Sequence, residues 1–224
     1  MGEIIVALNT NNREQALKWV DVLSEHVKIF KIGLPLFSKY GPGIVEEVKK
    51  KGVRVFLDMK LHDIPSVVGQ AVESLRDLEI DFVTIHLSGG REMAMAALSA
   101  AEGKVEIIGV TVLTSVAQEE FGHLYGTEIE KVVEKMVEDF VKIGGSNVVL
   151  SGREAPEIKR KYGIRVFVPG IRPSFAVTGD QSRVVTPEFA KKHGFDYIIV
   201  GRPITHSEDP VKSLLEIRRE FYGV

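Results

Sequence analysis

The segment VRVFLDMKLHDIP, residues 53–65, starts as a run rich in β-branched residues and ends with two carboxylates and an ammonium group. Short runs of this kind are typical of buried parallel strands. Because residues two apart on a strand share a face, Asp58 and Lys60 are predicted to point the same way at the strand end. Asp63 falls just past the strand, and Pro65 suits the first turn of a helix. The segment therefore predicts a strand with charged groups at its end, followed by a helix.

The same strand-then-helix pattern recurs along the whole chain. Helical periodicity is clearest over 127–143, where an apolar stripe lies opposite Glu and Lys residues. Eight strand and helix pairs fit a (β/α)8 TIM barrel of the α/β class, whose active site lies at the carboxyl ends of the strands. A doubly wound open sheet is the alternative, although NTNNRE (9–14) is no Gly-rich dinucleotide turn. The predicted strands, each bounded by Gly, Pro or polar residues, are 3–8, 27–33, 53–60, 81–86, 105–113, 146–150, 164–169 and 195–201.

The composition of the chain limits its possible domain organisation and binding partners. No linker or low-complexity segment divides the 224 residues, so we expect a single domain over 1–224. A formal net charge of −2 gives no basic excess for nucleic acid or acidic lipid. The chain has no cysteine, which excludes disulfides and thiolate chemistry and fits a cytoplasmic protein. We expect neither a signal peptide nor a membrane span, and the histidines show no spacing typical of a metal site.

A second ammonium group, that of Lys31, ends the apolar run VKIFKIG (27–33) and can reach the same barrel mouth. Alternating with Asp58, Lys60 and Asp63, it forms a nearly neutral array in which each charge favours the ionised form of its neighbours. A lysine held this way suits proton donation to a basic carbon better than nucleophilic attack. Taken alone, the Asp-x-Lys pair is equally compatible with a structural ion pair.

The last quarter of the chain carries candidate phosphate-binding residues. The seventh predicted strand leads into a long connection, 169–186, with the features of a lid. After the eighth strand, Gly201 allows close backbone approach and Arg202 offers a planar fork for phosphate oxygens, at the usual phosphate position of this fold. An exposed ion pair is the alternative role of Arg202. After the fifth strand, Thr114 and Ser115 can hydrogen-bond a heterocycle or cap a turn.

These segments together resemble the orotidine 5′-monophosphate decarboxylase family along nearly the whole chain. The matching motifs, in chain order, are IVALN, FKIG, FLDMKLHDIP, IHLSGG, VTVLTS, VPGIRP, DQSRVVTP and GRPIT. The resemblance implies a (β/α)8 barrel that converts orotidine 5′-monophosphate to uridine 5′-monophosphate (UMP) in de novo pyrimidine synthesis. It also implies that no cofactor or metal is used and that the protein is a homodimer.

The resemblance also assigns roles to residues. Lys60 is similar to the lysine that protonates C6 after carbon dioxide leaves, and Asp58 to the aspartate beside the departing carboxylate. Lys31 resembles the lysine that completes the charged array, and Asp63 resembles the aspartate donated across the homodimer interface. Thr114 and Ser115 align with residues near the base, and Arg172, Gln181, Gly201 and Arg202 with those that grip the phosphate and close the lid. The substrate-binding residues that it implies are Asn9, Lys31, Ile64, Pro65, Val67, Thr114, Ser115, Pro169, Arg172, Gln181, Gly201 and Arg202.

Two positions depart from the family pattern. Asn9 stands where relatives have an aspartate that supports the ribose contacts, and Val67 stands where they commonly have a threonine. We expect activity to survive but to be reduced. Two rival functions remain at the level of sequence: a magnesium-dependent aldol reaction, as in 3-hexulose-6-phosphate synthase, and a nucleotide-binding module that has lost the chemistry.

Overall fold

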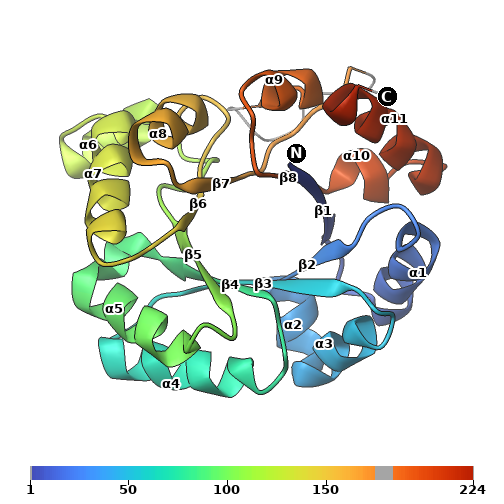
Figure 1. Cartoon of the computed structure of the whole chain (residues 1–224), viewed down its shortest axis with the longest axis horizontal. Helices are drawn as coiled ribbons and strands as arrows, with labels where there is room; N and C mark the ends of the chain where they lie inside the picture. Colours follow the sequence, from blue (N-terminus) through green and yellow to red (C-terminus); the bar gives the residue numbers. More distant parts are fainter. Residues whose placement is uncertain (1, 175–183, 224) are drawn as a thin grey trace.

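The computed structural model describes residues 2–174 and 184–223, and its strands form a closed parallel barrel in chain order (Figure 1). The pairing of β1 with β8 closes the ring, so the (β/α)8 prediction is confirmed and the open-sheet alternative is wrong. The strands are β1 (Glu3–Leu8), β2 (Ile29–Gly33), β3 (Arg54–Leu61), β4 (Phe82–His86), β5 (Glu106–Val110), β6 (Asn147–Val149), β7 (Arg165–Val168) and β8 (Tyr197–Val200).

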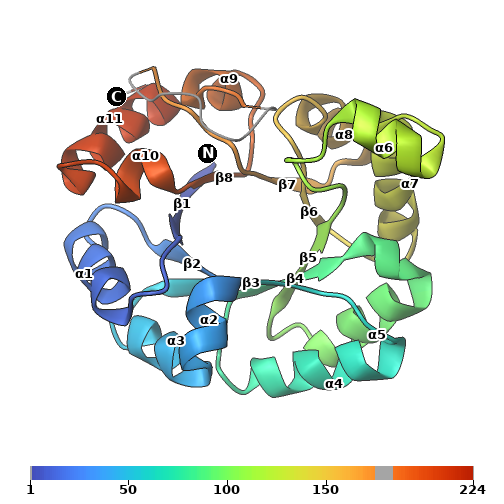
Figure 2. The same cartoon turned by 180° about the vertical axis from the view of Figure 1, so that it is seen from behind.

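Helices surround the strands as an outer ring, which Figures 1 and 2 show from the two ends of the barrel. Several begin where the sequence supplies a cap, because the side chains of Asn12, Thr186 and Asp209 each accept a backbone N–H of the first turn. The helices are α1 (Arg13–Leu23), α2 (Leu34–Tyr40), α3 (Pro42–Lys49), α4 (Pro65–Arg76), the 3-10 helix η1 (Leu87–Gly89), α5 (Gly90–Ala101), α6 (Gln118–Tyr125), α7 (Ile129–Lys142), α8 (Ala155–Tyr162), α9 (Pro187–Lys192), α10 (Arg202–Thr205) and α11 (Pro210–Tyr222).

The predicted strands are all present, but most are shorter than expected. The clearest difference is β5, predicted to reach residue 113, which ends at Val110. The apolar residues Val112 and Leu113 leave the ladder and line the barrel mouth instead. Apolar character alone does not distinguish a ladder residue from one that faces a cavity.

Aromatic and aliphatic side chains fill the barrel interior. The ring centroids of Phe82 and Phe167 lie 5.5 Å apart, and Phe167 stacks on Tyr197 at 4.1 Å. A larger apolar layer lies between the strands and the helices, where α7 contributes the buried side chains of Val133, Val137 and Phe140. Because side chains fill the interior of the barrel, a ligand must bind at one of its ends. The buried interior residues are Ile5, Ala7, Ile29, Phe56, Phe82, Ile108, Phe167, Tyr197 and Ile199.

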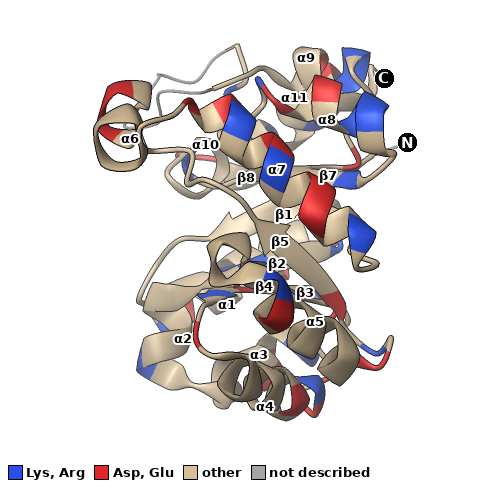
Figure 3. Ribbon diagram, turned by 90° about the vertical axis from the view of Figure 1, so that its left-hand side faces the viewer, with Lys and Arg blue, Asp and Glu red and all other residues tan. Residues whose placement is uncertain are grey.

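The outer helix surface carries charges of both signs. Along α7, basic and acidic residues alternate in the sequence (Figure 3), and Lys135 contacts Glu138 and Asp139 at 3.3 and 3.0 Å. Exposed pairs of this kind contribute little to stability but keep the face solvated. In the part of the chain that the structure describes, no helix combines the length and the apolar character that crossing a membrane requires.

Candidate active site

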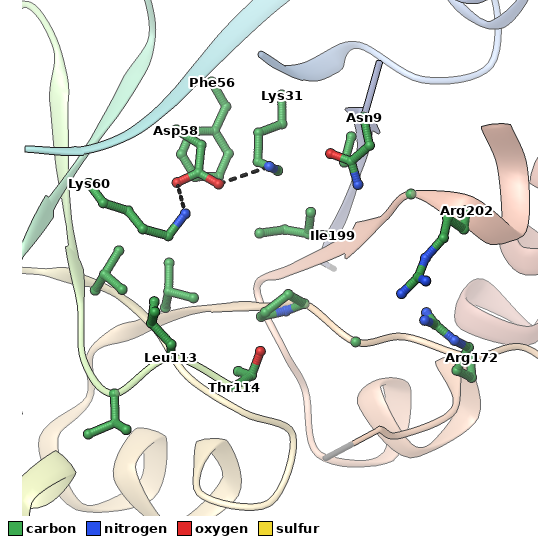
Figure 4. Close-up of a pocket in the computed structure, with 17 residues that line it drawn as sticks. Asn9, Lys31, Phe56, Asp58, Lys60, Leu113, Thr114, Arg172, Ile199 and Arg202 are labelled. Carbon is green, nitrogen blue, oxygen red and sulfur yellow. Dashed lines mark hydrogen bonds and ion pairs between the residues drawn. The ribbon is translucent and has the colours of Figure 1, made fainter. Parts of the chain in front are cut away.

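A bulge in β3 sets the position of the charged groups. Leu57 pairs with Val83 and Leu61 pairs with Ile85, so residues 58–60 of β3 lie opposite Thr84 alone. Lys60 has φ 50°, in the left-handed region that non-glycine residues rarely adopt. Such a conformation costs ~1–3 kcal/mol and is typical of functional sites. The sequence does not predict this bulge, and Asp58 and Lys60 both face the barrel mouth (Figure 4).

Asp58 is held between two ammonium groups (Figure 4). Its Oδ2 accepts a hydrogen bond from Lys31 Nζ at 2.8 Å, and its Oδ1 accepts one from Lys60 Nζ at 2.8 Å. The side chains of Lys31 and Asp58 are only 12% and 13% exposed, and that of Lys60 is 33% exposed. Burial raises the pKa of Asp58, but the charges and hydrogen bonds of Lys31 and Lys60 outweigh it and lower the pKa to about 2. The carboxylate is therefore ionised at neutral pH.

The array borders a cavity of about 220 Å³ at the carboxyl end of the barrel. Its floor includes Ala7, Phe56 and Ile199 from the barrel interior. Across the cavity from Lys60, the guanidinium groups of Arg172 and Arg202 lie close to one another (Figure 4). The predicted site residues that line the cavity are Asn9, Lys31, Asp58, Lys60, Thr114, Pro169, Arg172, Gly201 and Arg202.

The backbone holds Arg172 beside the mouth. Its N–H donates to the carbonyl of Val185 at 2.9 Å, next to an isolated bridge between Ile171 and Val185. Its Nη1 donates to the carbonyl of Ile171 at 3.0 Å, and the side chain is buried. The bond to Val185 joins the two described ends of the long connection between β7 and α9. Gln181, the other predicted phosphate ligand of this connection, lies outside the described residues.

Gly201 leaves space for a neighbouring side chain. A Cβ atom at this position would lie 2.8 Å from Asn9 Nδ2 and 3.6 Å from the Cβ of Ala7. Glycine therefore allows Asn9, at the end of β1, and Arg202, at the start of α10, to approach the same part of the cavity.

The remaining predicted residues lie outside the cavity of the single chain. Ser115 is exposed and does not contribute to the lining. Asp63 is exposed, and its Oδ1 accepts the N–H of Ile64 at 2.7 Å. Ile64 and Val67 are 62% and 44% exposed, so the start of α4 presents apolar side chains to solvent. The structure therefore separates a preformed set of cavity residues from an exposed set around α4.

Two histidines lie side by side next to the array without forming a metal site. The rings of His62 and His86 have centroids 5.5 Å apart, and the Ser88 hydroxyl lies 2.6 Å from His86 Nδ1. Burial lowers the pKa of His86, and the electrostatic influence of His62 and Lys60 lowers it further. Among residues 2–174 and 184–223, no three His, Asp or Glu side chains converge as a metal-binding group would require.

One buried polar residue was not identified from the sequence. Thr84 is completely buried in β4 and touches both Asp58 and Lys60 through its hydroxyl group. The available signal was a lone hydroxyl inside the apolar run FVTIH (82–86).

The low pKa of Asp58 predicts a pH dependence of stability. Because its pKa is about 2 in the folded chain and 3.8 ordinarily, the ionised carboxylate stabilises the fold above pH 4. This contribution, ~2 kcal/mol at 1.36 kcal/mol per pKa unit, is lost as the pH falls from about 5 to 2. The free energy of unfolding of the wild type, minus that of Asp58→Asn, should fall by this amount in urea titrations over that range. A pH-independent difference would contradict the ion-paired geometry.

The chain is similar to known proteins along nearly its whole length. The family described as Orotidine 5'-phosphate decarboxylase / HUMPS matches residues 2–217. The chain is 40% identical to orotidine 5'-phosphate decarboxylase of Saccharophagus degradans, covering 98% of this chain and 94% of the relative. It is 41% identical to the enzyme of that name from Wolbachia pipientis subsp. Culex pipiens, with 95% and 96% covered. The crystal structure of orotidine 5'-phosphate decarboxylase from Lactobacillus acidophilus superposes with a TM-score of 0.86 at 29% identity, covering 99% of each chain. From the match over nearly its whole length and from these relatives, we conclude that the chain belongs to the orotidine 5'-phosphate decarboxylase family.

Proposed function

We propose that the protein decarboxylates orotidine 5′-monophosphate to UMP in pyrimidine synthesis, without a cofactor, and that Lys60 protonates C6. The observation that carries this proposal is Asp58 held at 2.8 Å from both Lys31 and Lys60 beside the cavity. The family membership of the chain and the names of its relatives support the same reaction.

The two ends of the cavity suit the two ends of this substrate. Arg172 and Arg202 lie together on the side away from Lys60 (Figure 4), where their planar forks suit phosphate oxygens. Thr114, at the edge of the cavity, suits the amide edge of the pyrimidine. Asn9 and Lys31 lie between these regions, beside the ribose of a substrate placed this way.

The proposed reaction uses charge without covalent attachment to the protein. The bond between C6 and the carboxylate carbon breaks, carbon dioxide leaves, and the electron pair stays on C6. This pair lies in the plane of the ring, outside the π-system, so fixed charges must stabilise it. The Lys60 ammonium group supplies that charge and then transfers a proton to C6, which gives UMP and a neutral amine that solvent reprotonates.

Asp58 supports this step in two ways. It holds both ammonium groups in place, and its own charge repels the substrate carboxylate until that charge moves to C6. A single proton donor contributes only ~10²- to 10⁴-fold, whereas enzymatic accelerations extend to about 10¹⁷-fold. Binding energy from the phosphate must therefore also contribute by holding the reacting end in the array.

We further propose that the working protein is a homodimer in which Asp63 of each subunit completes the site of the other. The support is the exposed start of α4, where Ile64 and Val67 offer apolar surface beside the charged Asp63. Ile64, Pro65 and Val67 would then contact the substrate in the partner's site. A single domain over 1–224 is supported by the closure of β1 on β8, and the lack of cysteine favours a cytoplasmic location.

The proton-donor role of Lys60 predicts the outcome of a direct assay. Lys60→Ala should lower kcat, measured as loss of orotidine 5′-monophosphate absorbance, by ~10²- to 10⁴-fold or more, because the proton donor is removed. The wild type should turn over in EDTA. Lys135→Ala, a change of an exposed lysine on α7, is the matched control and should retain full activity.

Other results in this assay would select a rival function. Loss of this activity in EDTA would contradict the metal-free reaction, and a magnesium-dependent aldol reaction in its place would favour the 3-hexulose-6-phosphate synthase alternative. UMP binding without turnover in the wild type would favour a binding module. Full activity of Lys60→Ala would contradict the assignment of Lys60 as the proton donor to C6.

If each site takes Asp63 from the other subunit, two impaired variants should complement each other in a mixed dimer. When Lys60→Ala and Asp63→Ala are co-expressed, a mixed dimer contains one site with both wild-type residues. Random assembly should then give roughly a quarter of the wild-type activity per subunit, although each variant alone is impaired. If Asp63→Ala alone were fully active, or if co-expression restored nothing, Asp63 would have no role across the interface.

Replacing Asn9 by the aspartate that relatives have at this position should improve the enzyme. Asn9→Asp restores a charge beside Lys31 and should raise kcat/KM by about 5- to 150-fold, which corresponds to ~1–3 kcal/mol for a charge-assisted hydrogen bond. Asn11→Asp adds the same charge at an exposed position away from the lining and serves as control. Equal kcat/KM in Asn9→Asp and the wild type would show that the amide already meets the requirement.

A further inference from the structure

The hydroxyl group of Thr84 connects the two central residues of the array. Its Oγ1 accepts the backbone N–H of Lys60 at 2.8 Å and lies 3.1 Å from Asp58 Oδ1. Thr84 has no solvent exposure. A buried threonine in an apolar strand needs hydrogen-bond partners, and both partners of this one belong to the charged array.

The direction of these bonds follows from charge. An ionised carboxylate has no hydrogen to donate, so the hydroxyl must donate to Asp58. Its lone pairs then remain for the N–H of Lys60. A single side chain thus makes both bonds with no competition between them.

The bulge explains why this N–H needs a side-chain acceptor. Residues 58–60 lie opposite Thr84 alone, so β3 and β4 are out of ladder register there. The left-handed backbone of Lys60 is stable only if its surroundings hold it. The Thr84 hydroxyl replaces the missing ladder acceptor, and without it a backbone N–H would be left unsatisfied.

We propose that Thr84 is a positioning residue for the charged array, and this inference rests on the proposed decarboxylation. Through one hydroxyl, it fixes the backbone from which the Lys60 ammonium extends and the carboxylate that this ammonium contacts. It lies outside the cavity lining and so acts through Asp58 and Lys60, with no contact to the substrate.

Two substitutions of Thr84 distinguish the contribution of its hydroxyl group from that of its side-chain volume. Thr84→Val keeps the shape and removes both bonds, whereas Thr84→Ser keeps the hydroxyl. Since a misplacement of about 1 Å can cost ~10²-fold in rate, Thr84→Val should lower kcat by about 10- to 100-fold. The dissociation constant for UMP should change by less than about threefold, because the phosphate end of the cavity is untouched. Thr84→Ser should recover most of the lost kcat.

Thr111, directly after β5, provides a matched control. Thr111 is also buried, and its hydroxyl donates to the carbonyl of Val149 at 3.1 Å, a bond that involves no member of the array. Thr111→Val should lower thermal stability while leaving kcat within about threefold of the wild type. An equal fall of kcat in Thr111→Val and Thr84→Val, or an unchanged kcat in Thr84→Val, would overturn the positioning role.

An experiment that does not depend on activity tests the contact itself. Amide hydrogen exchange of Lys60, followed by NMR, should be at least about tenfold faster in Thr84→Val and near the wild-type rate in Thr84→Ser and Thr111→Val. An unchanged exchange rate in Thr84→Val would overturn the inference even if the enzyme is active. If the wild type fails to decarboxylate its substrate, the proposed function fails while this measurement still decides whether Thr84 holds the bulge.

Discussion

The site depends on one carboxylate, Asp58, shared by two ammonium groups. Lys31 and Lys60 each lie 2.8 Å from a different oxygen of Asp58, at the largely buried end of a packed barrel. Removing one member of such a group leaves an uncompensated charge, so the three residues form a unit. Their net charge is +1, which suits a site for an anion or for a developing carbanion. Neighbouring strands β2 and β3 supply these groups, and β4 supplies the hydroxyl that fixes their geometry.

The rest of the cavity complements this unit. The protein has a formal charge of −2, so an anionic substrate must be held by local groups. Arg172 and Arg202 lie together across the cavity from Lys60, on the connections that follow β7 and β8. In the proposed reaction the arginines hold the phosphate while the array acts on C6, at the other end of the nucleotide. The barrel brings these distant segments to one end because all its strands run in the same direction.

Much of this arrangement could be predicted from the sequence, and the failures have physical causes. Strand and helix periodicity predicted every strand and the buried stripe of α7, because burial on a regular element leaves a regular pattern. The bulge was missed because the spacing of Asp58 and Lys60 is the same in a regular strand. Thr84 was missed because its role depends on the register between β3 and β4, which one strand's sequence does not encode. Asp63, Ile64 and Val67 lie on the exposed surface of a single chain, so their predicted roles depend on a second chain.

Hydrogen exchange at C6 of the product tests the role of the charged array directly. When UMP is incubated with the protein in D₂O, proton NMR follows the loss of the C6 hydrogen, which requires the same carbanion as decarboxylation but no carbon dioxide. The wild type should accelerate this exchange, and Lys60→Ala saturated with UMP should do so far less, because the charge at C6 is gone. Equal exchange rates in the two proteins would contradict the claim that the array of Asp58, Lys31 and Lys60 stabilises the carbanion through Lys60.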